Sequence, residues 1–161
     1  MDQPQDPARL YQDAVIAHNR APRNFRKIQP CTHRADGHNP FCGDEVQLYL
    51  RITDERVEEA GFQGESCAIA TASASMLTTV VQGRTLSETR ELIAAMKALM
   101  ADAAAAERLP ETAAELRVLA AVHRYPGRIQ CAGLPWDTLD QALSASGSTN
   151  TDAEPSVRVG R

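Results

Sequence analysis

Aromatic residues are scarce in this sequence, and positive charge is not in excess. Phe, Trp and Tyr together make up 4% of the 161 residues, too few for a platform on which single-stranded bases stack. With 17 basic and 21 acidic residues, the formal net charge is −4, which argues against a broad nucleic-acid surface. The sequence therefore predicts proteins or small ions as partners and no nucleic acid.

The sequence also lacks the hydrophobic segments that direct a chain into or across a membrane. It contains no run of about 18 apolar residues, and residues 1–7 have neither the basic start nor the apolar stretch of a secretory signal. We therefore expect a cytoplasmic protein with no membrane partner. The four cysteines stay reduced there, which favours metal binding or catalysis over disulfides.

The N-terminal third of the chain predicts a helix followed by a small sheet. Asp6 and Pro7 are typical of a helix start, and Pro22 ends that helix near Arg20. Residues 23–43, with two prolines and two glycines, are predicted to be irregular. Apolar residues then alternate with polar ones over 46–52, which predicts a half-buried strand, and residues 56–63 can return as an antiparallel partner.

The remainder of the chain is predicted to be helical. Helices are expected over 68–81, from a Thr85–Glu88 capping box to about residue 100, over 111–124, and from near Cys131 onward. Strands grouped before helices indicate an α+β fold, with an N-terminal helix, a small antiparallel sheet of two to three strands and a C-terminal helical group packed on it. Residues 1–145 are expected to form a single domain. Residues 146–161 have a composition that cannot build a core and are predicted to be a disordered tail.

Three cysteines lie beside predicted turns or helix starts. Cys42 precedes the first strand, whereas Cys67 and Cys131 lie at predicted helix N-termini, where the helix dipole is expected to lower a thiol pKa. Asp44 is the nearest carboxylate to Cys42, and Gly43 permits a tight turn between them. Three thiolates and a carboxylate can bind Zn²⁺ tetrahedrally. No C-x-x-C pair is present, so inert core thiols remain an even alternative at this point.

A positive side chain lies close to one of these cysteines. Four anionic ligands outweigh the charge of a divalent cation, and Arg128, three residues before Cys131, could offset part of the excess. An ordinary surface arginine is the equal alternative. Cys31 matches no motif and is expected to be a free, exposed thiol, and the loop residues His33 and His38 are expected to be solvated.

The motifs around these cysteines resemble those of a known family. The motifs are Asn39-Pro-Phe-Cys-Gly-Asp44, Gly64-Glu-Ser-Cys-Ala-Ile-Ala-Thr-Ala-Ser-Ala-Ser-Met76, and Tyr125-Pro-Gly-Arg-Ile-Gln-Cys-Ala132 with Trp136 beyond, preceded by Leu10-Tyr11, His18 and Pro22-Arg23-Asn24. They are similar to the SufU-type branch of the IscU/NifU N-terminal domain family, the proteins of iron–sulfur cluster assembly. The likeness covers about residues 8–145.

The spacing of the cysteines selects the branch of that family. Cys131 follows Cys67 by 131 − 67 = 64 residues, a longer gap than in IscU-type proteins, so the resemblance implies a SufU-type insertion between 84 and 124. Gln130 stands where IscU-type proteins have a histidine, and it is not the lysine common in SufU-type proteins.

What the resemblance implies is a SufE/NifU-like fold and a zinc-binding sulfur acceptor. Its metal ligands would be Cys42, Asp44, Cys67 and Cys131. A SufS-like, pyridoxal-phosphate-dependent cysteine desulfurase forms a persulfide on its own cysteine, and Cys42 would leave the zinc and accept that sulfur. The chain would then be a sulfur carrier that serves an enzyme, rather than a stand-alone enzyme.

Two other functions are compatible with the same residues. The chain could be a scaffold that assembles a [2Fe–2S] cluster on Cys42, Cys67 and Cys131 and passes it to apo-proteins, with other cluster assembly proteins as partners, because thiolates bind zinc, iron and clusters alike. It could also be a structural zinc domain that binds a protein. A carboxylate ligand argues mildly against this last option.

Overall fold

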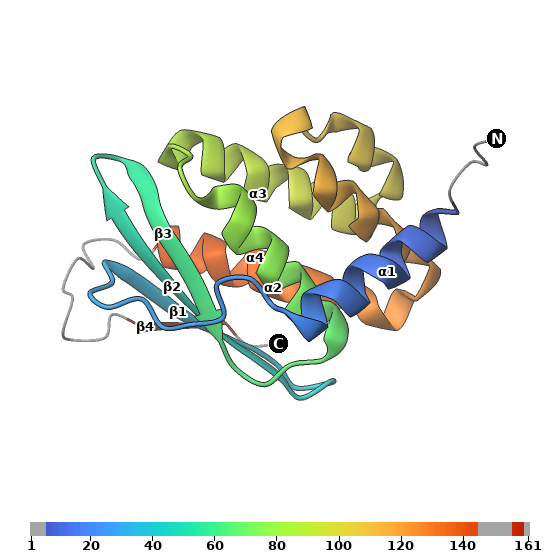
Figure 1. Cartoon of the computed structure of the whole chain (residues 1–161), viewed down its shortest axis with the longest axis horizontal. Coiled ribbons are helices and arrows are strands. Elements are labelled where there is room, and N and C mark those ends of the chain that lie inside the picture. Colours follow the sequence, from blue (N-terminus) through green and yellow to red (C-terminus); the bar gives the residue numbers. More distant parts are fainter. Residues whose placement is uncertain (1–5, 145–155, 160–161) are drawn as a thin grey trace.

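The computed structural model of the chain describes residues 6–144 and 156–159. In chain order, with η for 3₁₀ helices, the elements are α1 (Pro7–Arg20), β1 (His33–Asn39), β2 (Asp44–Thr53), β3 (Arg56–Gln63), α2 (Ala68–Val81), α3 (Leu86–Ala101), η1 (Ala103–Arg108), η2 (Glu111–Arg124), η3 (Pro126–Arg128), α4 (Ile129–Ser144) and β4 (Ser156–Val159). The helices lie to one side of the sheet (Figure 1). The predicted α+β class is confirmed.

The sheet has the strand order β3-β2-β1-β4. The β2–β3 hairpin turns at Asp54 and Glu55, which have φ values of 53° and 61°, a left-handed geometry that suits the twist of a two-residue hairpin. Strand β1 pairs antiparallel with β2, so that His33 lies opposite Leu50 and Asn39 opposite Asp44. This register brings the ends of β1 and β2 together at the turn that contains Cys42.

Strand β1 lies inside the segment predicted to be irregular, and that prediction was wrong for His33–Asn39. Its residues have weak strand propensity, but burial alternates along it, with Ala35, Gly37 and Asn39 buried. A Cβ atom at Gly37 would collide with Oγ1 of Thr138 in α4. Close packing of α4 against an otherwise poor strand therefore determines its conformation, which local sequence cannot reveal.

The C-terminal prediction also needs correction. Residues 156–159, part of the predicted disordered tail at 146–161, form β4 and pair in parallel with β1, with Ser156 opposite Arg34 and Val159 opposite Gly37. Residues 145–155 and 160–161 lie outside the described residues. A four-residue strand gains its backbone hydrogen bonds from a sheet edge, a long-range effect that composition does not predict.

Most of the predicted helix ends are confirmed. The Asp6 carboxylate accepts a hydrogen bond from the N–H of Ala8 at the start of α1, and Thr85 with Glu88 forms a reciprocal capping box before α3. Gly83 follows the Gln82 C-cap of α2 with a φ of +88°, as expected for the residue after a helix end.

The predicted helix over 111–124 is a 3₁₀ helix, η2, with a kink at Ala113. Its best-buried positions include Ala113, Leu116, Leu119 and Val122, which recur every three residues. That spacing matches three residues per turn rather than 3.6. Ala120 and His123, which an α-helical period would place on the same face as Leu116 and Leu119, are only half-buried.

The segment between 84 and 124 forms α3, η1 and η2, and packs against the rest of the domain. Helix α3 contacts α4, whereas η2 contacts α1 and α2. The core between the sheet and the helices contains large side chains that are almost fully buried, namely Leu48, Leu50, Phe62, Met76, Trp136 and Leu139. Within the described ranges, none of the helices has both the length and the apolar character needed to cross a bilayer.

Candidate metal centre

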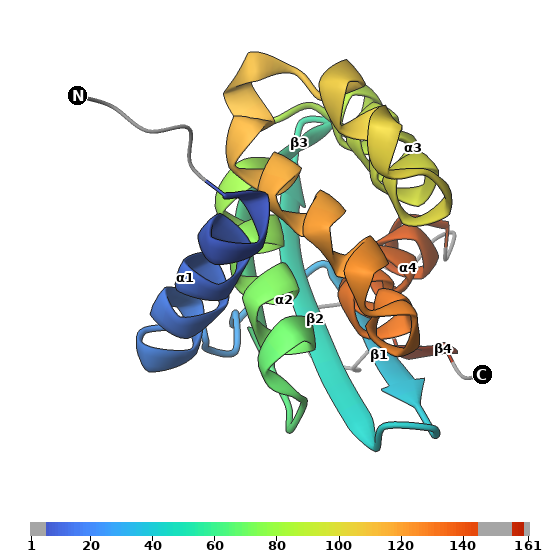
Figure 2. The same ribbon diagram turned by 90° about the vertical axis from the view of Figure 1, so that its right-hand side faces the viewer.

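Three distant segments of the chain meet at one end of the sheet. The β1–β2 turn, which carries Cys42 and leads into Asp44, lies near the N-terminal ends of α2 and α4 (Figures 1 and 2). Cys67 is the N-cap residue of α2, and Cys131 lies in the first turn of α4. The fold thus gathers residues that are 89 positions apart in the case of Cys42 and Cys131.

Local hydrogen bonds shape the turn that carries Cys42. The backbone N–H of Gly43 donates to the carbonyl oxygen of Asn39 over 2.8 Å, and the N–H of Phe41 donates to the Asn39 side-chain oxygen over 3.1 Å. Gly43 has a φ of +71°, which costs a residue with a Cβ about 1 kcal/mol or more. Glycine between Cys42 and Asp44 therefore permits the tight turn that the sequence predicted.

Cys42, Asp44 and Cys131 form a compact set of donor atoms. The sulfur atoms of Cys42 and Cys131 are 3.3 Å apart, and one ligand atom from each of the three residues lies within 4.8 Å of the other two. Two thiolates on one tetrahedral zinc ion lie roughly 3.8 Å apart. The observed spacing therefore suits ligands that share one cation.

Cys67 lies beside this set without being one of its three members. Its backbone N–H donates to Oδ1 of Asp44 over 2.8 Å, so the start of α2 orients the carboxylate. Its sulfur accepts the N–H of Ala70 over 3.4 Å and caps the helix. The structure thus brings three of the four predicted metal ligands together and places the fourth, Cys67, next to them.

The centre combines two buried ligand residues with one exposed thiol, Cys42, and one partly exposed thiol, Cys67. Cys131 is 0% exposed and Asp44 is 1% exposed, whereas Cys42 is exposed. The Oδ2 atom of Asp44 is buried and has no hydrogen-bond donor. A buried carboxylate oxygen without a partner is costly, and a cation would satisfy it. The residues present therefore fit a divalent metal such as zinc.

The environment of Cys131 differs from the one that its helix position predicted. Burial raises the pKa of the Cys131 thiol most, and the nearby side chains of Cys42, Asp44 and Cys67 raise it further. The expected lowering by the helix dipole is therefore wrong for Cys131, because desolvation and like charge outweigh the dipole. A bound cation reverses this balance, since it stabilises the thiolate form of its ligands.

Arg128 supplies positive charge at the same place. A hydrogen bond with Cys131, followed by the charges of Cys67, Cys131 and Cys42, raises the pKa of the Arg128 guanidinium. The guanidinium thus lies where it can stabilise the thiolate forms of all three cysteines.

Tyr11 is a neighbour of the centre that sequence reasoning missed. Burial, and after it the charge of Cys67, raises the pKa of the Tyr11 phenol to about 12. Its hydroxyl is buried with no hydrogen-bond partner among the described residues, and its ring stacks on Tyr125 at a centroid distance of 6.0 Å. The only sequence signal was that Leu10-Tyr11 matched a family motif.

The remaining candidate residues are not members of this group of donors. Cys31 was expected to be exposed, which was wrong: it is 6% exposed and packs with Ile28 and Tyr49. The group of three possible ligands found in the described part of the chain contains no histidine. Three histidines hydrogen-bond elsewhere, His18 to Ser75, His33 to Thr32 and His123 to Leu99.

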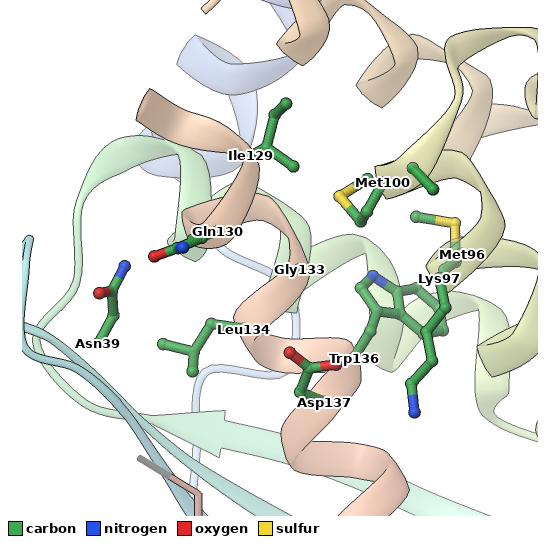
Figure 3. A pocket seen from close by; sticks show the side chains of 11 residues that line it. Asn39, Met96, Lys97, Met100, Ile129, Gln130, Gly133, Leu134, Trp136 and Asp137 are labelled. Carbon is green, nitrogen blue, oxygen red and sulfur yellow. The ribbon is translucent and has the colours of Figure 1, made fainter. Parts of the chain in front are cut away.

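A cavity of about 370 Å³ adjoins the centre between α3 and α4. Met96 and Met100 of α3 face Gly133 and Trp136 of α4 across it (Figure 3). Its lining includes Asn39, whose side-chain nitrogen is 4.0 Å from the Cys131 sulfur, and Gln130, the residue before Cys131. The cavity and the thiols therefore share one region of the surface.

Known proteins that are similar to this chain include two curated relatives. A relative named "Zinc-dependent sulfurtransferase SufU", from Bacillus subtilis, is 30% identical over 137 residues, which cover 84% of this chain and 90% of the relative. A relative named "Iron-sulfur cluster assembly scaffold protein IscU", from Streptococcus pyogenes, is 27% identical over 154 residues, or 94% of each chain.

A solved structure shares the fold over most of its length. It is that of FiSufU from Fervidobacterium islandicum, described as a candidate iron–sulfur cluster assembly scaffold protein for the SUF system, with a TM-score of 0.72, 27% identity and coverage of 84% of this chain and 97% of that one. Residues 10–132 match the sequence model of the NifU-like N-terminal domain, a span that contains all of the candidate metal ligands. The resemblance inferred from the motifs is confirmed, and the chain belongs to the family of NifU-like N-terminal domains.

Proposed function

We propose that this protein accepts sulfur on Cys42 from a cysteine desulfurase during iron–sulfur cluster assembly, with Cys42, Asp44, Cys67 and Cys131 as the ligands of a zinc ion. One observation carries the proposal. An exposed thiol, Cys42, lies 3.3 Å from the buried thiol of Cys131, next to a buried carboxylate oxygen of Asp44 that lacks a donor. That combination suits a metal centre with one ligand open to a partner.

Different residues of the chain hold the metal ion and react with the sulfur donor. Zinc, when bound, stabilises thiolates at neutral pH. Asp44, held through its other oxygen by the Cys67 N–H, and the buried Cys131 form a rigid base for the ion. Cys42 lies on a turn and is exposed, so it can reach a partner with less rearrangement than a residue on a helix.

Sulfur transfer then follows thiol–disulfide exchange. The Cys42 thiolate attacks the terminal sulfur of a persulfide on the donor's cysteine, forming a bond between Cys42 Sγ and that sulfur. The sulfur–sulfur bond of the donor breaks, and the donor cysteine leaves as a thiolate. One sulfur atom moves, the charge is conserved, and no external oxidant or reductant is required.

Arg128 fits the electrostatics of this step. Its guanidinium lies near the three thiols, where it offsets their excess negative charge. It also attracts an incoming persulfide, which is an anion at neutral pH. The partner that fits this chemistry is a pyridoxal-phosphate-dependent cysteine desulfurase of the SufS type, and the compartment is the reducing cytoplasm, where all four free cysteines persist.

A scaffold role is the second candidate, because the IscU relative carries that name and the same thiolates suit a [2Fe–2S] cluster. The resemblance to the SufU relative over 84% of the chain favours sulfur transfer. So does Gln130, which offers no imidazole to an iron atom. A purely structural zinc domain is less well supported, since closed structural sites do not need an exposed ligand such as Cys42.

Anaerobic purification followed by metal analysis and an absorption spectrum separates these functions. Sulfur transfer predicts about one zinc per chain, no visible absorption, and strong stimulation of a cysteine desulfurase. A brown protein with thiolate-to-iron bands would support the scaffold instead. The Cys42→Ala variant should lose the stimulation while remaining folded, and unchanged desulfurase turnover with that variant would defeat the proposal.

A further inference from the structure

One aromatic side chain beside the centre is unusually exposed. Phe41 directly precedes Cys42 and is 81% exposed, the highest value among the exposed large hydrophobic side chains of the described residues. Single exposed apolar residues are common. Phe41 differs because its backbone N–H is bonded to the Asn39 side chain, so an ordered turn projects the ring into solvent next to the reactive thiol.

A second exposed aromatic side chain stacks on a neighbour of the thiols. Tyr125, 40% exposed, stacks on Tyr11, and the Tyr11 phenol is near enough to Cys67 and Cys131 for their charges to raise its pKa. The whole sequence contains three Phe, three Tyr and one Trp. Two of these few aromatic side chains are therefore exposed on residues that lie next to the thiols or next to Tyr11.

The cavity between α3 and α4 extends the same surface. It is lined mainly by apolar side chains, among them two methionines, which adapt to the shape of an inserted group. Asn39 both lines the cavity and holds the Phe41 backbone. Its volume of about 370 Å³ is large enough for one or two side chains of another protein.

We propose that Phe41 and the cavity lined by Met96, Met100 and Trp136 form the docking surface for the sulfur-donating protein. The Phe41 ring inserts into an apolar recess beside the donor's persulfide-bearing segment, and an apolar side chain of the donor enters the cavity. This inference rests on the proposed function and adds the surface by which the donor is recognised.

Charge and position favour a protein donor over a second copy of this chain. The Arg128 guanidinium lies near the three thiols and complements an anionic persulfide, whereas a second copy would bring another Arg128 and another set of thiols to the same place. The donor must also bring its sulfur into bonding contact with Cys42. Any protein that does so covers the adjacent Phe41 and buries an aromatic anchor near the middle of the contact.

The test measures sulfide release by the desulfurase of the same organism at increasing concentrations of this protein. The variants are Phe41→Ala, and Ala101→Trp, which places an indole at the cavity mouth from an exposed position at the end of α3. The matched control is Ile16→Ala, which removes an apolar side chain that is 49% exposed on α1. Phe41→Leu tests whether an apolar group of similar size rescues docking.

Phe41→Ala and Ala101→Trp should each raise the apparent KM for this protein about tenfold and leave kcat within about twofold. The control and Phe41→Leu should stay near the wild-type KM. All variants should retain wild-type zinc content and accept sulfur from inorganic polysulfide, which needs no docking. That second readout separates lost docking from a damaged centre.

An unchanged KM for Phe41→Ala, with wild-type protein still stimulating the desulfurase, would overturn the docking surface and leave the proposed function standing. Failure of the wild-type protein to stimulate the enzyme or to take up sulfur from polysulfide would overturn both. A variant that alters the oligomeric state in sedimentation, but not the KM, would assign the surface to a second copy of this chain and also contradict the proposal.

Discussion

Replacing Asp44 by asparagine should move metal affinity and metal-free stability in opposite directions. Asparagine keeps an oxygen that can accept the N–H of Cys67, a bond that spans 2.8 Å in the wild-type protein. It removes the negative charge at Oδ2, which is buried without a donor. In the metal-free protein this relieves an uncompensated charge next to Cys131, so stability should stay equal or rise.

The effect on zinc binding follows from the loss of one anionic ligand. Replacing a residue that only supports a metal ligand costs about 10–100-fold in affinity, so losing a direct ligand should cost at least about 100-fold. At a fixed excess of free zinc, a 100-fold weaker affinity lowers the stabilisation by zinc by about 2.7 kcal/mol.

Urea unfolding with and without buffered zinc, together with chelator competition, measures both quantities. Asp140→Asn is the matched control, because it removes the same charge from a residue that pairs with Lys97 on the surface. Two results would refute the conclusion that Asp44 binds a cation: Asp44→Asn keeps the wild-type zinc affinity, or its metal-free form is several kcal/mol less stable than the wild-type protein.

Three further outcomes follow from the same structure. Burial, and after it the charge of Arg23, lowers the pKa of His18 below its ordinary value of 6.5, so the unfolded chain binds the proton more tightly than the folded chain does. The free energy of unfolding should therefore fall as the pH drops below 6.5 towards the folded-state pKa, and it should fall less in His18→Gln. A free energy of unfolding that does not change with pH would contradict this. Gly37→Ala should destabilise the fold by about 1–3 kcal/mol in urea unfolding, because its methyl group collides with Thr138; wild-type stability would show that α4 does not constrain β1. Cys31→Ala should keep wild-type zinc content by metal analysis, since Cys31 packs with Ile28 and Tyr49, and loss of zinc would place Cys31 at the centre.

The features that local sequence could predict are those with local causes. The Asp6 cap, the Thr85–Glu88 capping box and the glycine after α2 each act within a few residues. The hairpin of β2 and β3 follows from alternation and a turn. For the centre, the motifs that contain Cys42, Asp44, Cys67 and Cys131 identified segments that the fold brings together.

The features that sequence missed depend on tertiary contacts. Strand β1 has poor strand propensity and is held by β2 and α4. Cys31 is buried by residues of a separate small cluster. The raised pKa of Cys131 comes from burial and from side chains up to 89 positions away, which outweigh the local helix dipole. Tyr11 lies near the thiols only because α1 packs against α2.

The most direct test of the central claim is mass spectrometry of the peptide that contains Cys42 after the protein has met a desulfurase and its cysteine substrate. Acceptance of sulfur at the exposed thiol predicts the mass of one added sulfur atom on Cys42, removable by a reducing agent, with Cys31 unmodified. Sulfur found only on Cys67 or Cys131, or on no cysteine while the desulfurase turns over, would contradict the account.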